Sequence, residues 1–434
     1  MMMAQRITKK KYYKIVFELA APLAIGSGDN ESTDKDLIRD ANGCPYIPAS
    51  SITGVIRDIL TKNDKDKVKE YFGDVDINSG KNEDVSISES RIVFYDATIS
   101  AGTPRITVRD SVALDDYKTA KKGAKFDMEV LEPGVEFTTF IEQNYTSDAY
   151  EDYGLEIARV FLYEKPLFGG KSMRGYGSIC NATVSEMTFD LSKNVEEWLK
   201  FDLYDTGIEW SNSEIFDNNK DGELKEITLH LELKGGLSLR RYTTKVSKGE
   251  KSEPDMEQLT VGKEQIPVIP GTSWAGAISQ RMKEFGIIKG EKGSIFGFVE
   301  GEGKDSKARS KISFSESLIQ GGDFKIISRN SIDRFTGGTV DGALYTEKTY
   351  YGGETDLKMG WHSNESMTDL EKKALAAALT DLHFGFLSIG GETSIGRGIF
   401  TIAAIDGKAI PEPKPENSGE VYHVILNAIE EVFK

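Results

Sequence analysis

Cysteine and histidine are scarce in this chain, which has 434 residues but only two cysteines and four histidines. Cys44 and Cys180 cannot supply a disulfide framework for a chain of this length, and the histidines lack the spacing of metal ligands. Long apolar runs are also missing, because no stretch approaches the roughly 18 residues of a membrane span. These absences argue against disulfide-rich, zinc-binding and membrane-spanning classes, and they favour a soluble protein of the reducing cytoplasm.

Positive charge is in short supply too, because 54 lysines and arginines face 70 aspartates and glutamates, for a net charge of −16. Proteins that coat nucleic acid neutralise its phosphates with lysine and arginine, so an acidic chain does not bind by bulk charge. Any nucleic-acid site must therefore be local. Walker A, His-Glu-x-x-His and Rossmann motifs are absent, which removes the usual anchors of nucleotide hydrolysis and hydride transfer.

What the chain does contain is an internal repeat. The segment Pro45–Gly54 is echoed by Pro267–Gly276, and the glycine-rich segment Gly169–Gly177 is echoed by Gly390–Gly398. Three shorter echoes lie between them in the same order, one of which aligns Arg105 with Arg329. All five keep an offset of about 222 residues. A collinear series at a nearly constant offset predicts a duplicated domain.

The repeat divides the chain into four expected parts. We expect a first domain over 1–195, a linker over 196–224, a second domain over 225–410, and a proline-rich linker with a C-terminal helix over 411–434. The linker contains Asp217–Gly222, whose composition is typical of a turn. The apolar residues between Val421 and Val432 fit one helical face, which either packs on its own domain or docks on a partner.

The pattern within each half predicts an α+β fold. Alternating strands are expected over 13–19 and 226–233; Glu18 interrupts the first apolar run, so this segment is read as mature protein rather than a signal peptide. Helices follow, with Ser50 or Ser51 and Thr272 or Ser273 as the expected N-caps. Next come strands over 91–96 and 311–316, a variable hairpin region, helices over 154–163 and 369–382, the glycine-rich loop and a closing strand.

This order of elements is that of two tandem ferredoxin-like domains with inserted loops and hairpins. Both helices of such a domain cover one face of an antiparallel sheet. The other face is left for ligands, and RRM-type proteins bind RNA there.

The two glycine-rich loops are candidates for anion binding. Consecutive N–H groups at Gly169 and Gly170, and at Gly390 and Gly391, can cradle a phosphate. Positive charge comes from Lys171, Arg174 and Arg397. The alternative is that the glycines only permit tight turns.

The motifs together resemble the repeat-associated mysterious protein (RAMP) superfamily of CRISPR systems. Gly169–Gly177 and the segment Pro45–Arg57 carry the resemblance, which extends over nearly the whole chain, twice. It is closest to the backbone subunits of type III RNA-targeting effector complexes. The tandem arrangement, with Arg329–Gly338 in the second copy, resembles the double-backbone subunit of the type III-D branch. The resemblance implies RAMP domains that bind guide RNA and a loop aspartate that cuts target RNA with a divalent cation.

The resemblance also implies where cleavage would take place. Asp34 precedes the Ile38–Asp40 triplet and takes the position of the cleaving residue. Asp255 takes that position in the second half, where the triplet is missing and Glu257 competes for the role. A loop carboxylate can hold Mg²⁺ or Mn²⁺ beside the scissile phosphate while the 2′-OH of the RNA attacks. Asp34 also belongs to an acidic run of a kind that is often merely solvated.

RNA contacts are expected at scattered positions. Ser50 and Ser51 open a helix whose N–H groups offer a phosphate site, and Arg57 follows one to two turns later. Lys122 belongs to a lysine cluster that also includes Lys118, where the family carries a protruding hairpin. Further cations that could line the groove are Arg105, Arg109, Arg329 and Arg334.

The sequence therefore predicts a backbone subunit that binds guide RNA, target RNA and other CRISPR effector subunits, with no membrane and no small-molecule substrate. Metal-dependent endoribonuclease activity is expected at one or both acidic loops. Two alternatives remain open. One is a catalytically silent RNA-binding scaffold, and the other is a guide-RNA-processing endoribonuclease, which usually needs a general base such as histidine.

Overall fold

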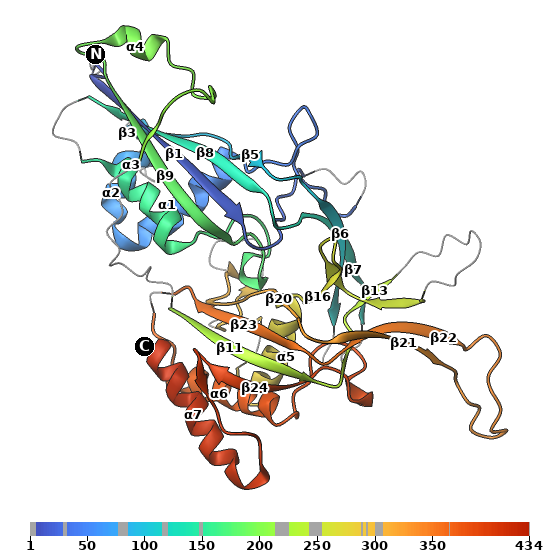
Figure 1. Ribbon diagram of the computed structural model, residues 1–434. Helices are drawn as coiled ribbons and strands as arrows, with labels where there is room; N and C mark the ends of the chain where they lie inside the picture. The colour runs from blue at the N-terminus through green and yellow to red at the C-terminus, as the bar shows by residue number, and fades with distance from the viewer. Residues whose placement is uncertain are drawn as a thin grey trace, which may run out of the picture. The chain divides into compact units, whose positions relative to one another are not determined.

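The computed structural model describes residues 6–28, 33–76, 86–114, 120–146, 151–212, 225–242, 254–287, 290–291, 294–299, 307–363 and 365–433. The turn at Asp217–Gly222 and Lys118 lie outside these described residues. The first of two compact units comprises Met1–Val112, Lys122–Ser172 and Tyr176–Glu223, and the second comprises Ala113–Lys121, Met173–Gly175 and Leu224–Lys434. Both units mix helices with β-sheet (Figure 1). No helix in the described ranges is long and apolar enough to cross a membrane.

The first unit is built on a sheet with the strand order β10-β9-β1-β8-β4, in which β5 also pairs with β8. The strands are β1 (Lys9–Leu19), β4 (Ile92–Phe94), β5 (Thr98–Ala101), β8 (Glu136–Tyr145), β9 (Ile179–Asp190) and β10 (Ser211–Asn212). β1 is central and runs antiparallel to both β8 and β9. The predicted strand over 13–19 is confirmed and begins earlier, at Lys9.

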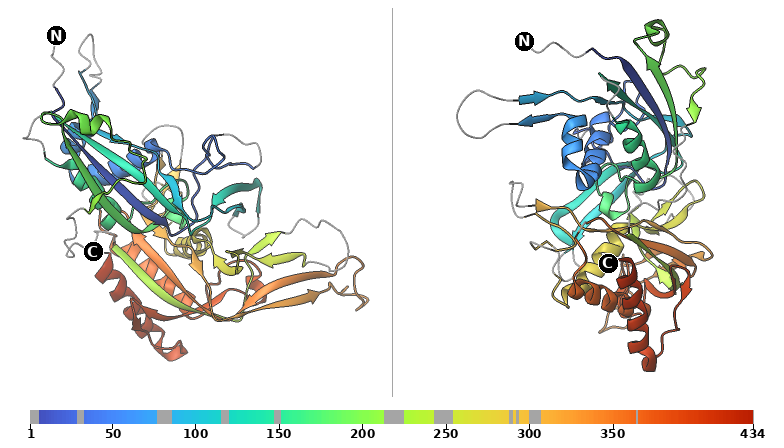
Figure 2. Two further views of the ribbon diagram at one scale, coloured as in Figure 1. Left: turned by 45° about the horizontal axis from the view of Figure 1, so that its top comes forward. Right: turned by 90° about the vertical axis from the view of Figure 1, so that its left-hand side faces the viewer.

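Three helices cover one face of this sheet, as the right-hand view of Figure 2 shows. They are α1 (Ala49–Asn63), α2 (Lys65–Phe72) and α3 (Tyr153–Arg159), and a π-helical turn, Val160–Glu164, continues α3. Alternation along β1 turns Ile15 and Phe17 toward the helices, where they join Ile52, Ile56 and Ile157 in one buried cluster. Each such side chain contributes about 1.5–3 kcal/mol by leaving water. β2 (Asp74–Asp76) and β3 (Ser86–Ser88) form a short, separate antiparallel pair.

The expected serine and threonine N-caps are wrong. Pro48 is the N-cap of α1, and Pro270 is the N-cap of α5 (Gly271–Lys283). The predicted caps lie inside the first turn instead. The Asp96 carboxylate accepts a hydrogen bond of 2.6 Å from the N–H of Ala49, so a side chain distant in sequence caps α1.

The opposite face of the first sheet is covered by the chain itself. Residues 191–212, where the linker was expected to begin, form α4 (Val195–Leu199) and β10 against β9. Trp198 Nε1 donates a 2.9 Å hydrogen bond to the Tyr12 hydroxyl, and Phe201 packs against the Tyr12 and Phe189 rings. Trp210 packs on Phe140 of β8. The face that was expected to be open for ligands is therefore occupied by aromatic side chains of this segment.

The second unit repeats the plan with the strand order β19-β23-β11-β24-β25. Its strands are β11 (Lys225–Lys234), β19 (Ile312–Phe314), β23 (Glu354–Trp361), β24 (Ile399–Ile405) and β25 (Lys408–Ala409). The central strand β11 is antiparallel to β23 and β24, as β1 is to β8 and β9. Each central strand also shifts register once along its pairing with the last long strand. The two sheets therefore share order, direction and one irregularity.

Helices α5, α6 (Asp369–His383) and α7 (Ser418–Val432) contribute to one hydrophobic cluster of the second unit. A capping box starts α6, because Thr368 and Glu371 each bond to the other's backbone N–H. Val421, Ile425 and Ile429 of α7 are fully buried in the same cluster as the strand residues. Of the two alternatives for the C-terminal helix, packing on its own unit is thus the one observed.

The other face of the second sheet is polar and acidic. Glu226, His230, Asp356 and Lys358 point away from the buried residues that alternate with them on β11 and β23. His230 Nδ1 lies 2.8 Å from Asp356 Oδ1, and this hydrogen bond is the main reason that the pKa of His230 is raised. Such a face repels phosphate, so it does not offer the ligand surface that the sequence led us to expect.

A β-hairpin follows the second strand of the sheet in each unit. The first is β6 (Ile106–Leu114) paired with β7 (Ala120–Leu131), and the second is β21 (Asp323–Arg329) paired with β22 (Tyr345–Tyr351). β22 also pairs with β12 (Gly236–Leu237) and with β14 (Met256–Gln258), and β14 in turn pairs with β13 (Arg240–Tyr242). The remaining short strands are β15 (Thr260–Val261), β16 (Ile266–Ile269), β17 (Phe298–Val299), β18 (Lys307–Ala308) and β20 (Ser317–Leu318). In each unit one strand of the hairpin, β7 in the first and β22 in the second, contacts the acidic loop.

Candidate nucleic-acid interface and acidic loops

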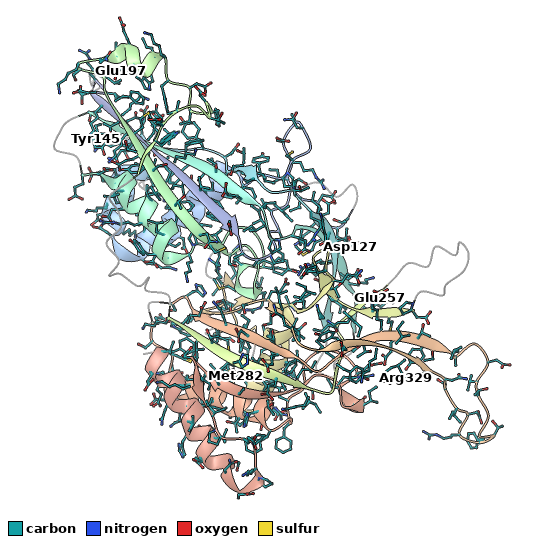
Figure 3. All side chains as sticks on the ribbon, in the orientation of Figure 1. Asp127, Tyr145, Glu197, Glu257, Met282 and Arg329 are labelled. Carbon is teal, nitrogen blue, oxygen red and sulfur yellow. The ribbon has the colours of Figure 1, made fainter. Side chains whose placement is uncertain are left out.

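The first acidic loop is fastened to β7 through Asp34. The Asp34 N–H donates a 2.9 Å hydrogen bond to Asp127 Oδ1, and the Asp127 N–H donates another of 2.9 Å to Asp34 Oδ2. Asp34 itself is exposed. Figure 3 labels Asp127, which lies on β7. We call this reciprocal pair of bonds the first clasp.

A second set of contacts keeps the loop in place. The nearly buried Asp36 accepts hydrogen bonds of 2.8 Å from the N–H and the hydroxyl of Thr33. Glu129, also on β7, accepts from the Leu37 N–H at 3.0 Å and pairs with Arg39 at 2.9 Å. Residues 33–39 of the loop are therefore held in place and against β7, while the Asp34 side chain remains exposed.

The second acidic loop repeats the clasp on β22. The Asp255 N–H donates a 2.9 Å hydrogen bond to the Thr346 carbonyl, and the Thr346 N–H donates one of 2.8 Å to Asp255 Oδ2. The Thr346 hydroxyl adds a third at 3.3 Å. Asp34 and Asp127 are 93 residues apart, and Asp255 and Thr346 are 91 apart, so the two clasps occupy matching places in the repeat.

The second clasp also distinguishes Asp255 from Glu257, the other candidate for cleavage in the second unit. Glu257 is the middle residue of β14 and is paired in register with Lys348, so it belongs to a strand and not to the loop. Asp255 is thus the structural counterpart of Asp34. The missing sequence triplet obscured this relation, which the pairing of each loop with its hairpin makes plain.

The acidic loops can be tested for their fit to Mg²⁺ or Mn²⁺. No group of three or more histidine, cysteine, aspartate or glutamate side chains suited to a metal occurs within the described ranges. The first clasp brings together two carboxylates, Asp34 and Asp127, whereas the second has one, Asp255. Mg²⁺ typically takes one or two protein carboxylates and completes its shell with water and substrate phosphate. The residues present fit such a loosely held ion and do not fit an all-protein cage.

The start of α1 is less open to phosphate than its sequence suggests. Asp96 already accepts from the first helical N–H, and the N–H of Ser51 donates to the Pro48 carbonyl at 2.9 Å. Ser50 and Arg57 are exposed on this helix and remain able to contact a ligand.

The glycine-rich loops use backbone N–H groups within the protein. Gly170 and Gly177 donate to the carbonyls of Ala24 and Pro22, at 2.7 and 2.8 Å. Gly391 donates to the Ser238 carbonyl in the same way, at 2.7 Å. A Cβ at Gly177 would lie 1.7 Å from the Phe168 carbonyl oxygen, so glycine is required there for close packing. The N–H groups of Gly170 and Gly391 are therefore used within the protein and are not available to cradle a phosphate.

Lys171, the third residue of the first loop, points its ammonium group at two aromatic rings. Its Nζ lies 4.6 Å from the centre of the Phe126 ring and 5.8 Å from that of Tyr176, and it donates a 2.8 Å hydrogen bond to the Ser111 hydroxyl. Burial, followed by the nearby charges of Lys35 and Arg109, lowers the pKa of Lys171 to about 8.

Arg109 and Arg397 are committed to buried ion pairs. Arg109 pairs with Glu132 at 2.9 Å, and the two side chains are 4% and 1% exposed. In the second loop Arg397 pairs with Glu347 at 2.8 Å and hydrogen-bonds to the Tyr351 hydroxyl. Arg329 pairs with the same Glu347 oxygen at 2.9 Å.

The other predicted cations differ in their access to solvent. Lys122 and Arg334 are exposed on or beyond the hairpin strands, and Arg105 is half-buried just before β6. Arg174 is partly buried, donates to the Met173 carbonyl at 2.9 Å, and has its pKa lowered to about 10 by burial. Arg105 precedes its hairpin strand whereas Arg329 ends one, so the echo that aligned them does not pair equivalent residues.

Sequence reasoning missed the hairpin residues that hold the loops, namely Asp127, Glu129, Thr346 and Glu347. Each belongs to β7 or β22, in the region that was predicted only as a variable hairpin. The spacing of 91–93 residues between each loop aspartate and its partner is the signal that could have found them, once the repeat was known.

Comparison with known proteins gives one family. Residues 16–180 and 244–401 match the family model described as the RAMP superfamily. The two matched ranges together exceed half of the chain and fall one in each half of the repeat. No curated protein matches the chain.

Proposed function

Because the chain belongs to the RAMP superfamily, we propose that it is a backbone subunit of a type III CRISPR ribonucleoprotein that binds guide RNA and cuts complementary target RNA. RAMP proteins are associated with such complexes. The finer assignments, to the type III-D branch and to two ferredoxin-like domains, belong to the same proposal. The shared strand order of the two sheets and the tandem match support them. We propose guide RNA, target RNA and other effector subunits as partners, in the cytoplasm.

One observation carries the catalytic part of the proposal. Asp34 and Asp255 make the same kind of clasp, each with the corresponding hairpin strand of its own unit, β7 or β22. The duplication accounts for a shared fold, but the loop sequences around Asp34 and Asp255 have diverged, and both loops still keep an aspartate in this contact. A need to hold a carboxylate at a fixed place beside the hairpin in each unit accounts for it.

The chemistry follows from what these carboxylates can do. Asp34 and Asp255 would each hold Mg²⁺ or Mn²⁺, which supplies charge stabilisation to the phosphate when bound. The 2′-oxygen of the RNA attacks the adjacent phosphorus and loses its proton to water, and the bond to the 5′-oxygen breaks. The products are a 2′,3′-cyclic phosphate and a 5′-hydroxyl, which gains a proton. The clasp keeps each carboxylate on the substrate side of its loop throughout.

Cleavage of a complementary RNA by the assembled complex tests the proposal. Asp34→Asn and Asp255→Asn keep the size of each side chain and remove its charge. We expect each variant to lose one set of cuts while retaining the other, and the double variant to lose all cutting. Glu257→Gln is the matched control and is expected to cut like the wild type.

The alternatives give different outcomes in the same assay. If the double variant cuts as well as the wild type, the nuclease assignment to these loops is wrong. If the wild-type complex binds target RNA and leaves it intact with Mg²⁺ and with Mn²⁺, the chain is a silent scaffold. Cutting of repeat RNA by the isolated chain without metal would identify a guide-processing enzyme.

A further inference from the structure

Two ammonium groups meet on one phenylalanine ring next to the first clasp. Lys35 Nζ lies 5.7 Å from the centre of the Phe126 ring, and Lys171 Nζ lies 4.6 Å from it. Lys35 directly follows Asp34, and Phe126 directly precedes Asp127. The cation pair and the carboxylate pair are therefore neighbouring contacts between the same loop and the same strand.

Within the described part of the chain, neither Lys35 nor Lys171 has a carboxylate within ion-pair distance, and Arg109 nearby is bonded to Glu132. Bringing like charges together in a partly buried place is unfavourable, and the pKa of Lys171 is lowered first by burial and then by the charges of Lys35 and Arg109. Such a cluster is stabilised when an anion enters it.

The glycine-rich loop of the second unit can be compared directly with that of the first. The loop residue that corresponds to Lys171 is Glu392, and both have left-handed backbone conformations, with φ of 54° and 57°. A 3₁₀ turn follows each of them, Ser172–Arg174 and Thr393–Ile395. One loop therefore carries a lysine where the other carries a glutamate, on the same local backbone.

The charges of the second loop are balanced within the protein. Arg397 takes the place of Tyr176 and is held by Glu347 and the Tyr351 hydroxyl, with Glu392 Oε2 at 3.8 Å from its Nε. Arg329 also uses Glu347. An incoming phosphate would have to break buried ion pairs there, which is strongly unfavourable because it leaves a buried charge without its partner.

We propose that Lys35 and Lys171, seated on the Phe126 ring, bind a phosphodiester group of RNA in the first unit, and that the second unit has no equivalent site. The identification of the ligand as RNA rests on the proposed function, whereas the demand for an anion rests on the cation cluster itself. The site lies beside Asp34, so a phosphate held there fixes the RNA next to the first acidic loop alone. The two loops then position RNA differently despite their common clasp.

The test uses the full chain with Lys35→Gln, Lys171→Gln and the double variant. One arm measures binding of guide RNA to the chain. A second arm measures binding of target RNA to the assembled complex. Lys358→Gln removes one positive charge from the acidic face of the second sheet and is the charge-matched control.

We expect each single variant to weaken RNA binding about tenfold in one arm, as for the removal of one charge-assisted hydrogen bond. We expect it also to reduce the dependence of log Kd on log salt by about 0.7 for each RNA phosphate that the protein no longer neutralises. Lys171→Arg keeps the charge and should bind like the wild type, as should Lys358→Gln. Weaker binding in the first arm identifies the ligand as guide RNA, and weaker binding in the second arm identifies it as target RNA. Binding within twofold of the wild type in both arms, with an unchanged salt dependence, overturns the site.

Thermal unfolding separates ligand binding from a packing role. Removing one of two crowded cations relieves repulsion, so RNA-free Lys171→Gln should unfold at the same temperature as the wild type or higher. A lower temperature together with unchanged RNA binding would show that the lysine only packs on Phe126, which also overturns the proposal.

Failure of this site can be told from failure of the proposed nuclease. If the lysine variants bind RNA normally and cutting still depends on Asp34, only the phosphate site is refuted. Lysine-dependent binding without any Asp34- or Asp255-dependent cutting refutes the proposed nuclease and leaves the site standing.

Discussion

Asp127 is the residue whose role differs most between the two units, because its counterpart in the second clasp is Thr346. Asp127 uses Oδ1 to accept from the Asp34 N–H and its own N–H to hold the Asp34 carboxylate. Thr346 does the equivalent work with its backbone carbonyl, its N–H and a hydroxyl. The side chain of Asp127 is therefore needed to position the first loop, and a second carboxylate comes with it.

Substitution of Asp127 should separate geometry from charge. Asp127→Asn keeps an oxygen that accepts from Asp34, whereas Asp127→Ala does not. We expect Asp127→Ala to slow the cleavage assigned to Asp34 by about tenfold to a hundredfold, because small displacements of reacting groups are costly. Asp127→Asn should stay near the wild-type rate, with the Asp255-dependent cuts as the internal reference. Equal slowing by both variants would contradict a purely positioning role and indicate a metal ligand.

If Lys171 binds RNA as proposed, RNA binding should depend on pH. Its pKa falls from 10.5 to about 8, first because of burial and then because of Lys35 and Arg109. Tyr176 and Glu132 also line this region, and the Asp34–Asp127 clasp is adjacent. Above about pH 8 the folded chain loses this proton while the unfolded chain keeps it up to about pH 10.5, so the stability of the RNA-free chain rises with pH in that window.

Binding should show the opposite trend, because a phosphate needs the charged lysine. We expect the RNA affinity of the wild type to fall between about pH 7 and about pH 9.5 at constant salt, and that of Lys171→Arg to fall less, since an arginine stays charged. Fluorescence anisotropy with a labelled single-stranded RNA measures both. Identical pH profiles for the two proteins would rule out a contribution of Lys171.

Among the elements, α4 and the segment around it decide what the first sheet can do. Trp198 bonds to Tyr12, lies 4.8 Å beneath the Lys10 ammonium group, and belongs to a half-buried aromatic layer. This layer covers the face that RRM-type proteins use for RNA. The segment is thus part of the first unit's structure, and we expect the RNA of the proposed function to bind elsewhere, along the hairpin and the loops.

Removal of the Trp198 side chain should therefore affect stability and leave RNA binding intact. We expect Trp198→Ala to lower the free energy of unfolding by about 2 kcal/mol, because it loses aromatic packing and a hydrogen bond. Trp198→Phe should lose less, since it keeps a ring. Denaturant unfolding and RNA binding are measured on the same samples. Weaker RNA binding at unchanged stability would mean that this face is an RNA platform after all.

At the scale of the whole molecule, the net charge of −16 is expected to weaken the attraction between the chain and RNA phosphates. Exposed lysines and arginines are scattered over the chain among a larger number of carboxylates, and those on or near the acidic loop and the hairpins include Lys35, Lys122 and Arg334. Arg109 and Arg397 are paired inside the protein. On the proposed function, we therefore expect the isolated chain to contact only a small number of phosphates, with other subunits adding to the binding surface.

We expect RNA binding by the isolated chain to be weak and sensitive to salt, and binding by the assembled complex to be much tighter. With about three phosphate contacts, raising the salt from about 50 to about 200 mM should weaken the isolated chain's binding by tenfold or somewhat more. Titrations at both salt concentrations, with and without the partner subunits, provide the comparison. Tight, salt-insensitive binding by the lone chain would contradict this view.

Much of the fold was predictable because it depends on local patterns. The strands β1 and β11, the helices α1, α5 and α6, and the repeat itself follow from alternation, helical spacing and self-similarity. The caps of α1 and α5 were not predictable in this way, because Asp96 reaches Ala49 from 47 residues away. The cover over the first sheet was missed for a similar reason, since a polar, acidic segment gives little sign that its few aromatics will pack.

The sequence by itself determined that this chain is a duplication, that its glycine-rich loops recur in register, and that Asp34 is a candidate for cleavage. Only the tertiary structure decided which residue of the second loop is its counterpart, that the N–H groups of Gly170 and Gly391 are used internally, and that Lys171 faces Lys35 while Glu392 faces Arg397. The physical reason is that these facts concern pairs of residues brought together from distant parts of the chain. A pattern along the chain specifies which groups are present, whereas their charges and hydrogen bonds acquire a function only when folding sets them side by side.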